Sequence, residues 1–564
     1  MEPSAIAEKR ELERRQQHID EESASQSFAK SDHAAPQTGL AKGIMLTACC
    51  TLSLMIVSMT ASSVAIGLST TERDLNIPED QLQWMLSAYA LSSGCLLIPF
   101  GRLADLYGRR NIFLIGCLFQ GAFSLGCGFG NDLITIAVLR GFQGLGGAAT
   151  IPACLGILAH AFPPGNARSL AFATFSAGQP MGGAIGFLLG GALSQVTSTS
   201  WRTMYWVVAG LSAVCIVMAL IFVDRDGPST EVDRRVDWLG AFLITAGLVL
   251  IVFVLSDGEL APNQWSTPYI IGLLVAGVIF VLLFLAWQYY LERPEVRKNY
   301  SIWTPPPLMK LSLWKRGKGR FAAIQLVIFC LMAGFQSWIL WIVLYYQNYE
   351  RLNPVLTMIR MIPMFPAGVI CNIIIALVVA HVDGMHLIAF GCTCSSVAGI
   401  LLAVINPNAP YWAFGFPSSI LIVIGADFVF AGGTLFVAKL SLPHEQSLAG
   451  GLYQTMAMLG QAFGLAITTI VFDRVRATQS AKLGVTIDRD GLDAPLPAQL
   501  KAYRATSWTI VGFTLFAAVL AVLFLRGVGV LGGPHTPPEQ DPQEVTAIDK
   551  EHEAKGQTKS DSPQ

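Results

Sequence analysis

Two ionisable side chains fall inside long apolar runs of the sequence. Asp427 lies in the middle of the string IGADFVF, and Arg140 opens the string RGFQG within the run 133–160. An ionisable side chain at such a position usually faces an interior polar path, and a low-dielectric surrounding disfavours the charged form of a carboxyl group. We therefore predict that Asp427 exchanges protons. The alternatives are a carboxyl group that only packs against a hydroxyl group or an arginine, and an arginine that snorkels to the outer surface.

A ten-residue string rich in glycine and arginine, GRLADLYGRR, follows the second apolar run. Its acid, Asp105, can pair with basic neighbours and accept hydrogen bonds from amides at a helix amino terminus. We interpret the string as a tight cytoplasmic turn that forms a gate, with an ordinary positively charged loop as the alternative. The gate residues are Gly101, Asp105, Gly108, Arg109 and Arg110.

Glycines recur at intervals of four in the run 168–193, which aligns them on one helix face. A smooth face lets another helix approach closely. It predicts either a groove along which two helices slide or rock, or tight packing alone. The groove residues are Gly182, Gly186, Gly190 and Gly191, and Pro180 in the same run can bend the helix.

Polar and aromatic side chains in the apolar runs are candidates for a substrate cavity. Gln143 and Gln179 lie beside glycines at mid-membrane positions. Arg360 is a candidate partner for Asp427 or an anchor for a substrate anion, with surface snorkelling as its alternative. Trp341 and Gln347 can line an outer vestibule or act as membrane-interface anchors.

The elements that must position these residues are membrane-spanning helices. A span needs about twenty largely apolar residues, and lipid leaves the backbone no hydrogen-bond partner but itself. About fourteen runs meet this requirement: 43–68, 82–101, 112–130, 133–160, 168–193, 204–223, 238–256, 268–289, 321–346, 354–380, 385–405, 411–438, 448–472 and 507–528. Lysine and arginine concentrate in alternate short connections, which places both termini in the cytoplasm.

The composition agrees with a membrane protein. Of 564 residues, 53% are hydrophobic and 13% are charged, whereas about 25% of residues are charged in soluble domains. The net charge of −1 excludes a nucleic-acid-binding footprint. The 11 cysteines lie in apolar runs without zinc-ligand spacing, so we interpret them as apolar fillers and expect no metal and no cofactor.

Three strings together resemble the major facilitator superfamily. GRLADLYGRR is similar to its motif A, RGFQG is similar to its motif B, and the glycines of 178–191 partly match motif C, the antiporter signature. With about fourteen spans, the chain further resembles the fourteen-spanner drug:proton antiporter family and its fungal aminotriazole-resistance-like branch. Two positions depart from the family pattern. Phe187 replaces the motif C proline, and Thr60 stands where the family often has an acid in the first helix, so Asp427 is the candidate substitute for that acid.

The resemblance implies an all-α polytopic membrane protein with the major facilitator fold, built from two six-helix bundles plus two inserted helices. A solute would bind near the membrane midplane between the bundles, the gate string would latch the cytoplasmic side, and Arg140 would tune proton exchange at Asp427. The implied organisation is a disordered amino terminus (1–42), a first bundle (43–223), the inserted pair (236–290), a basic cytoplasmic loop (291–320), a second bundle (321–530) and a disordered carboxyl terminus (531–564).

These observations predict a secondary active transporter that exports a small drug-like, toxic or metabolite solute in exchange for protons by alternating access. Import or proton-independent diffusion of a small metabolite is the alternative, favoured by Thr60 and Phe187, and a non-transporting membrane sensor is a remote one. No nucleophile–base set or phosphate-binding loop is visible, so we predict no enzyme. The expected partners are a small-molecule substrate, protons and the lipid bilayer, without nucleic acid, and the chain is expected to be a monomer. We expect it in the plasma membrane, with the vacuolar membrane as the alternative, and the sequence leaves the substrate open.

Overall fold

The computed structural model describes residues 39–75, 84–163, 165–225, 235–258, 261, 264–293, 304–352, 354–442, 445–485, 494–527 and 529–531. Contacts divide the chain into a short unit, residues 1–45, and a large unit, residues 46–564. Of the short unit, residue 39 and the start of the first helix are described. All contacts discussed below lie in the large unit. The segments predicted to be disordered lie almost entirely outside the described residues.

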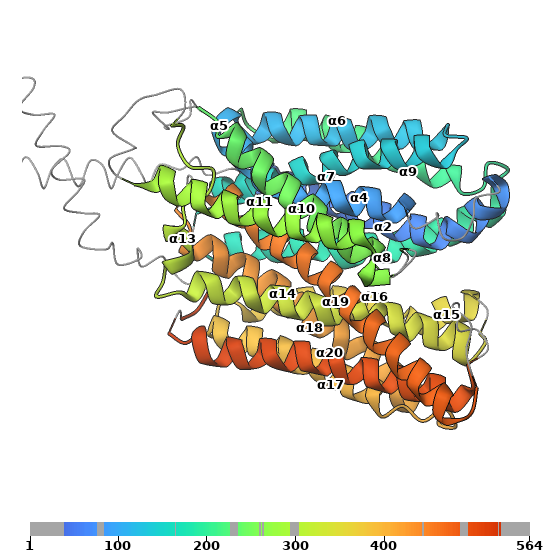
Figure 1. The fold of residues 1–564 in the computed structure, drawn as a ribbon. Helices are drawn as coiled ribbons and strands as arrows, with labels where there is room; N and C mark the ends of the chain where they lie inside the picture. The colour runs from blue at the N-terminus through green and yellow to red at the C-terminus, as the bar shows by residue number, and fades with distance from the viewer. Residues whose placement is uncertain are drawn as a thin grey trace, which may run out of the picture. The chain divides into compact units, whose positions relative to one another are not determined.

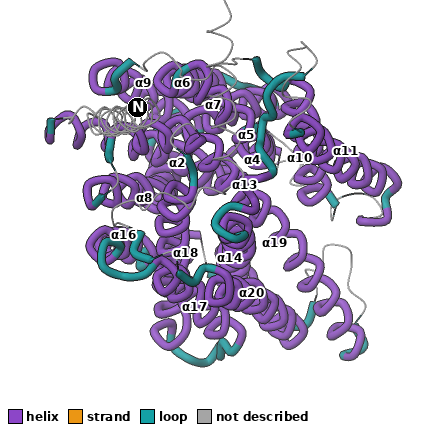
Figure 2. Tube along the Cα trace, turned by 90° about the vertical axis from the view of Figure 1, so that its left-hand side faces the viewer, coloured by secondary structure: helices purple, strands orange, loops and turns teal. Residues whose placement is uncertain are grey.

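The regular elements in the described ranges are helices, as the tube in Figure 2 shows. The helices are α2 (Leu40–Leu75), α4 (Trp84–Cys95), α5 (Leu97–Tyr107), α6 (Arg109–Gly128), α7 (Leu133–Ala161), α8 (Asn166–Val196), α9 (Arg202–Phe222), α10 (Trp238–Asp257), α11 (Pro268–Glu292), α13 (Ser312–Lys315), α14 (Arg320–Leu344), α15 (Pro354–Met361), α16 (Met364–Val378), α17 (Gly384–Ala403), α18 (Tyr411–Leu440), α19 (Gln446–Lys482) and α20 (Leu496–Phe524). A 3-10 turn, η1 (Gln264–Ser266), precedes α11, and a π-helical turn, η2 (Tyr345–Tyr349), extends α14.

Twelve helices of the described residues are long and apolar enough to cross a membrane. The two other predicted spans are helical as well. One is α8, which has 31 residues but many small and polar side chains. The other is α4 followed by α5, with a break at Leu96. Because a helix of 20 residues is about 30 Å long, each is long enough to span a bilayer, and the predicted all-α polytopic fold is confirmed.

The helices before the inserted pair pack mainly with one another, and so do those after it. In the first bundle α6 contacts α7 and α9, while α4 and α5 contact α7. In the second bundle α14 contacts α18, α19 and α20, while α17 contacts α18 and α20. Figure 1 shows the two groups by colour, blue to cyan for the first and yellow to red for the second.

The two bundles meet along a small number of helix pairs, which we call the junction. The main pairs are α5 with α19 and α8 with α16, and α8 also contacts α18. The inserted helix α10 touches α4 and α5 of the first bundle and α19 of the second. Its partner α11 is buried over only 17% of its most apolar stretch. Most of α11 therefore presents apolar side chains outward, as a lipid-facing helix must.

The structure corrects several predicted helix boundaries. The tight turn predicted in the gate string is confined to Gly108, at a φ of 100°, because α5 continues to Tyr107 and α6 begins at Arg109. Only glycine adopts this backbone conformation at low cost. The run 354–380 is divided into α15 and α16 next to Pro363, because proline removes a helical hydrogen bond. The runs predicted to end at 472 and to begin at 507 extend to Lys482 and back to Leu496, because polar side chains continue a helix beyond its apolar stretch.

Candidate transport site and gate

Asp427 lies at the junction. Its side chain is buried, and Asn372 of α16 donates a hydrogen bond of 2.9 Å from Nδ2 to Asp427 Oδ2. A Cβ built at Gly368 of α16 would lie 3.3 Å from Asp427 Oδ2 and 3.1 Å from Pro180 Cβ of α8. No lysine or arginine of the described residues forms an ion pair with Asp427. The carboxyl group therefore lies between helices of both bundles with one amide donor, a surrounding that suits its neutral form better than its charged form.

Asn372 was not singled out by the sequence. Besides its bond to Asp427, it donates 2.9 Å to the carbonyl oxygen of Gly368, and its own Oδ1 has no partner among the described residues. The signal that could have found it is an amide side chain inside the apolar run 354–380, the same signal that pointed to Gln143. Its free acceptor next to the carboxyl group is available for a polar group of a solute.

Arg140 is fully buried in the first bundle, which excludes snorkelling to the surface. Its Nε donates 2.8 Å to the carbonyl oxygen of Met85, and one terminal nitrogen donates 3.0 Å to Oε1 of Gln143. The guanidinium lies 4.6 Å from the ring centroid of Tyr89. The structure shows no contact between Arg140 and Asp427, so any influence of one on the other has to be indirect.

Asp105 joins the two bundles at one end of the junction, which we call the Asp105 end. Its Oδ1 accepts 3.3 Å hydrogen bonds from Nε and a terminal nitrogen of Arg109. Its Oδ2 accepts a 3.3 Å hydrogen bond from the backbone amide of Leu448, the third residue of α19. The amino terminus of a helix carries partial positive charge. The carboxylate of Asp105 therefore holds α5 of the first bundle to α19 of the second.

The other residues of the gate string connect helices within the first bundle. Arg109 donates 3.3 Å to the carbonyl oxygen of Gly156 in α7, and Arg110 donates 2.8 Å to that of Leu220 in α9. Gly101 is buried inside α5. These bonds fix the helices that present Asp105 to its partner.

A further set of charges lies directly beside the Asp105 contact. Glu445 immediately precedes α19 and binds Lys310 at 2.7 Å and Arg316 at 3.0 Å. Both basic residues belong to the segment that follows the inserted helices. In the same segment, the backbone amides of Leu311 and Ser312 donate 3.1 Å hydrogen bonds to Glu292 at the end of α11. The inserted helices α10 and α11 are thus connected to the amino terminus of α19, which Asp105 also binds. The sequence did not reveal this connection.

The glycine face of α8 packs against α2. A Cβ at Gly178 would lie 2.6 Å from the carbonyl oxygen of Thr51, and one at Gly186 would lie 2.7 Å from that of Met59. Gly182 lies between these two glycines, and a Cβ there would overlap the backbone of Met55. A Cβ at Gly190 would lie 3.0 Å from Ser63 Cα. Gly191 is half-buried in α8. The structure thus shows close packing within the first bundle at this face.

The remaining cavity candidates lie in different places. Trp341 is buried in the second bundle, stacked on Phe472 with ring centroids 4.4 Å apart and edge-on to Tyr503. Gln347 is half-buried in the π-helical turn η2. Gln179 is half-buried in α8 next to Pro180, close to the junction. Of these three, only Gln179 lies beside the helices that surround Asp427.

Arg360 has a carboxylate partner, but that partner is Glu350 rather than Asp427. Its guanidinium also lies 4.8 Å from the ring centroid of Tyr346 and 5.5 Å from that of Tyr411. The structure therefore does not support Arg360 as the partner of Asp427. The sequence could not separate the two acids, because the choice depends on the rotation of α15 and α18 about their axes.

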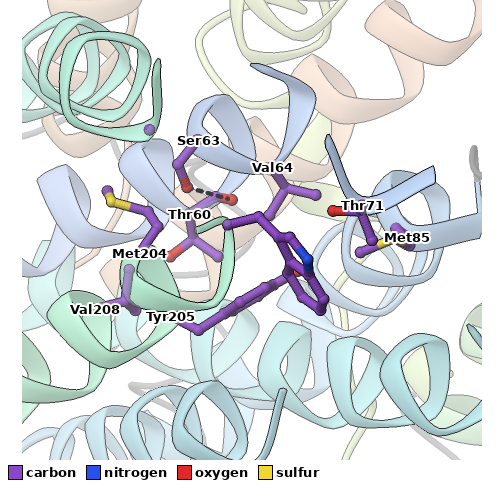
Figure 3. Close-up of a pocket in the computed structure, with 10 residues that line it drawn as sticks. Thr60, Ser63, Val64, Thr71, Met85, Met204, Tyr205 and Val208 are labelled. Atoms are coloured by element: carbon purple, nitrogen blue, oxygen red, sulfur yellow. Dashed lines mark hydrogen bonds between the residues drawn. The ribbon is translucent and has the colours of Figure 1, made fainter. Parts of the chain in front are cut away.

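A small cavity lies inside the first bundle, between α2, α4, α8 and α9. It offers about 10 Å³ to the centre of a water molecule and is lined by Thr60, Ser63, Val64, Thr71, Met85, Gly190, Trp201, Met204, Tyr205 and Val208. Figure 3 shows Thr60, Tyr205 and Met204 around it. A space of this size holds about one water molecule, so it is no drug-sized binding site.

The wall of this cavity is held by charges near the end of α2. Trp201 donates 3.0 Å from Nε1 to Asp74, and Arg202 forms an ion pair with the same carboxylate. The hydrogen bonds from Trp201 and Arg202 hold the pKa of Asp74 below its ordinary value.

Comparison with known proteins agrees with this architecture. Residues 48–237 match the family model described as Major Facilitator Superfamily. The solved crystal structure of the human organic anion transporter MFSD10 superposes with a TM-score of 0.57 at 12% sequence identity, covering 85% of this chain and 99% of that chain. The chain has the major facilitator fold.

Curated relatives of the chain include proteins named as transporters. The low affinity ammonium transporter of Saccharomyces cerevisiae is 27% identical over 457 residues, which cover 79% of this chain and 81% of the relative. The efflux pump terJ of Aspergillus terreus is 25% identical over 456 residues, which cover 79% of this chain and 80% of the relative. The protein is therefore a multi-pass membrane transporter.

Proposed function

We propose that this transporter exports a small drug-like, toxic or metabolite solute in exchange for protons, and that it belongs to the fourteen-spanner drug:proton antiporter family and its aminotriazole-resistance-like branch. The observation that carries the proposal is Asp427. It is a buried carboxyl group hydrogen-bonded by Asn372, and Gly368 beside it packs closely against Pro180 of the first bundle. A titrating group at the contact between two moving bodies couples its protonation to their motion.

The coupling follows from the cost of burying charge. A carboxylate without a cation needs water, so deprotonation of Asp427 favours separation of α8 from α16 and α18. Protonation removes this requirement and favours the closed contact seen here. A proton taken up on one side and released on the other then drives the bundles between their two arrangements.

The Asp105 end is the gate of this cycle. In the structure Asp105 binds the amino terminus of α19, so this end of the junction is closed. We place both termini in the cytoplasm, so that the Asp105 end faces the cytoplasm and the closed contact corresponds to an inward-closed state. Opening inward requires this contact to break, whereas Arg109 and Arg110 keep their bonds within the first bundle.

Some relatives support export. The efflux pump terJ is an exporter by its name, and the match spans four-fifths of its length. Asn372 provides a polar group beside Asp427 for a solute that carries hydrogen-bonding atoms, and Gln179 precedes Pro180 on the facing helix α8. We therefore place the substrate at the junction, between α8, α16 and α18.

The test is solute counterflow in proteoliposomes that contain the purified transporter, with an imposed pH gradient and a panel of labelled solutes. We expect solute movement opposite to protons, lost in Asp427→Asn and retained in the matched control Asp473→Asn, whose carboxylate pairs with Arg476 on α19. Survival of pH-driven movement in Asp427→Asn would refute the role of this carboxyl group.

A second candidate function is import or proton-independent diffusion of a small solute. It is favoured by Thr60, which is buried and accepts a 3.0 Å hydrogen bond from Gln120 at the position where the resembling family often has an acid. The relative named low affinity ammonium transporter points the same way. In the same assay, solute movement that ignores the pH gradient would establish this function instead.

A further inference from the structure

Among the described residues, the positive charge of Arg140 has no carboxylate partner. The residue is fully buried, and its hydrogen bonds go to the neutral oxygens of Met85 and Gln143. No aspartate or glutamate of the described residues forms an ion pair with it. Buried charges in proteins are normally paired or ligated, because an isolated one is strongly unfavourable. The first bundle as described therefore lacks one negative charge.

Three hydrogen-bond donors of this region also have no acceptor. They are a terminal nitrogen of Arg140, Nε2 of Gln143 and the hydroxyl group of Tyr205, each in a side chain that is more than nine-tenths buried. Arg140 and Tyr205 belong to one region, because Met85, whose carbonyl oxygen binds Arg140, lies in the same buried cluster as Tyr205. A set of buried donors around an uncompensated guanidinium is the arrangement that binds an anion.

The small cavity of the first bundle supplies the space. Tyr205 lines it, as does Met85, whose carbonyl oxygen binds Arg140 (Figure 3). Thr60 also lines the cavity and contributes a neutral hydroxyl group at the position where the resembling family often has an acid. Because the cavity holds about one water molecule, it fits a monatomic or similarly small ion and excludes a larger solute.

We propose that this transporter binds a small monovalent anion, such as chloride, in the cavity lined by Met85 and Tyr205, held by the Tyr205 hydroxyl group and by the charge of Arg140 next to Met85. The anion replaces the carboxylate that the bundle lacks and neutralises Arg140 in its buried position. The site is separate from Asp427, and it stands whether the protein exports or imports its solute.

The test is direct binding of radiolabelled chloride to the purified full-length transporter by scintillation proximity, with gluconate replacing chloride at constant ionic strength. We expect saturable binding, weakened about tenfold or more in Arg140→Gln because the charge is removed. Thr60→Asp should also abolish binding, since it supplies a covalent carboxylate at the cavity wall. Arg476→Gln is the matched control and should bind as the unmodified chain does, because Arg476 already has a carboxylate partner.

Melting temperatures keep the test decisive if Arg140→Gln does not fold. A bound anion stabilises the folded state, so the unmodified chain should melt higher in chloride than in gluconate, whereas Thr60→Asp should melt at the same temperature in both. Competition between chloride and acetate tests whether the site takes a small inorganic anion or a carboxylate. Displacement by ions of the size of chloride, with acetate much weaker, supports the proposal, whereas tighter binding of acetate, which is larger than the cavity allows, would overturn it. Absence of saturable binding of either ion, or binding unchanged in both Arg140→Gln and Thr60→Asp, would overturn the proposal.

Discussion

Replacing Gly182 by alanine tests what the glycine face of α8 does. Gly182 lies on the face that packs against α2, and an added Cβ would overlap the backbone of Met55. The adjacent Gly183 is the matched control, because its Cβ would meet only the hydroxyl groups of Ser58 and Ser62, at 3.6 and 3.7 Å. The two substitutions are chemically identical and one residue apart, so they differ only in what the methyl group touches.

The magnitude follows from two opposing effects. Alanine stabilises a helix interior by about 1 kcal/mol relative to glycine, and Gly183→Ala should show this gain. At Gly182 the obstacle is backbone, which cannot move aside as a side chain would. Overpacking of this kind costs about 1–3 kcal/mol. We therefore expect Gly182→Ala to be less stable than Gly183→Ala by roughly 2–3 kcal/mol, when the cost is taken at its upper end.

The assay is thermal unfolding of both purified variants in one detergent, combined with transport per folded molecule. We expect Gly182→Ala to melt several degrees lower, with transport reduced only in proportion to the folded protein. A Gly182→Ala variant that melts at or above Gly183→Ala would refute the packing argument. A selective loss of transport at full stability would instead assign the face to sliding of α2 against α8.

Two further outcomes follow from the charges around the junction. Glu445 binds Arg316, whose side chain is 17% exposed, and Lys310, whose side chain is 38% exposed. Double-mutant cycles with Glu445→Gln should therefore give a larger coupling free energy for Arg316→Met than for Lys310→Met, up to about 3 kcal/mol. Equal or absent couplings would show that Glu445 does not hold the inserted pair to α19. The lowered pKa of Asp74 means that its contribution to stability is complete above its unfolded value near 3.8 and is lost as pH falls through the lower folded value. Asp74→Asn should therefore lower the melting temperature slightly at pH 7, by an amount that corresponds to about 1 kcal/mol or less for so exposed a pair. A difference between the two proteins that persists undiminished at pH 2 would contradict the stabilising role of the ionised Asp74.

The sequence by itself determined the class of protein, because membrane insertion depends on local apolarity that is written into consecutive residues. It also located Asp427 and Arg140, since an ionisable residue stands out in an apolar run whatever surrounds it. The string around Asp105 was identifiable in the same way. Helix ends were less accessible, because polar residues continue α5 and α19 beyond the apolar stretch.

Only the tertiary structure decided which side chains meet. Asn372 rather than Arg360 binds Asp427, and the glycine face of α8 packs on α2. These outcomes depend on the rotation of each helix about its axis and on its neighbours, which are set by packing of whole helix faces. The missing counter-charge of Arg140 is of the same kind: Thr60 suggests it in the sequence, but the burial of Arg140 and the neutral oxygens around it establish it in the structure.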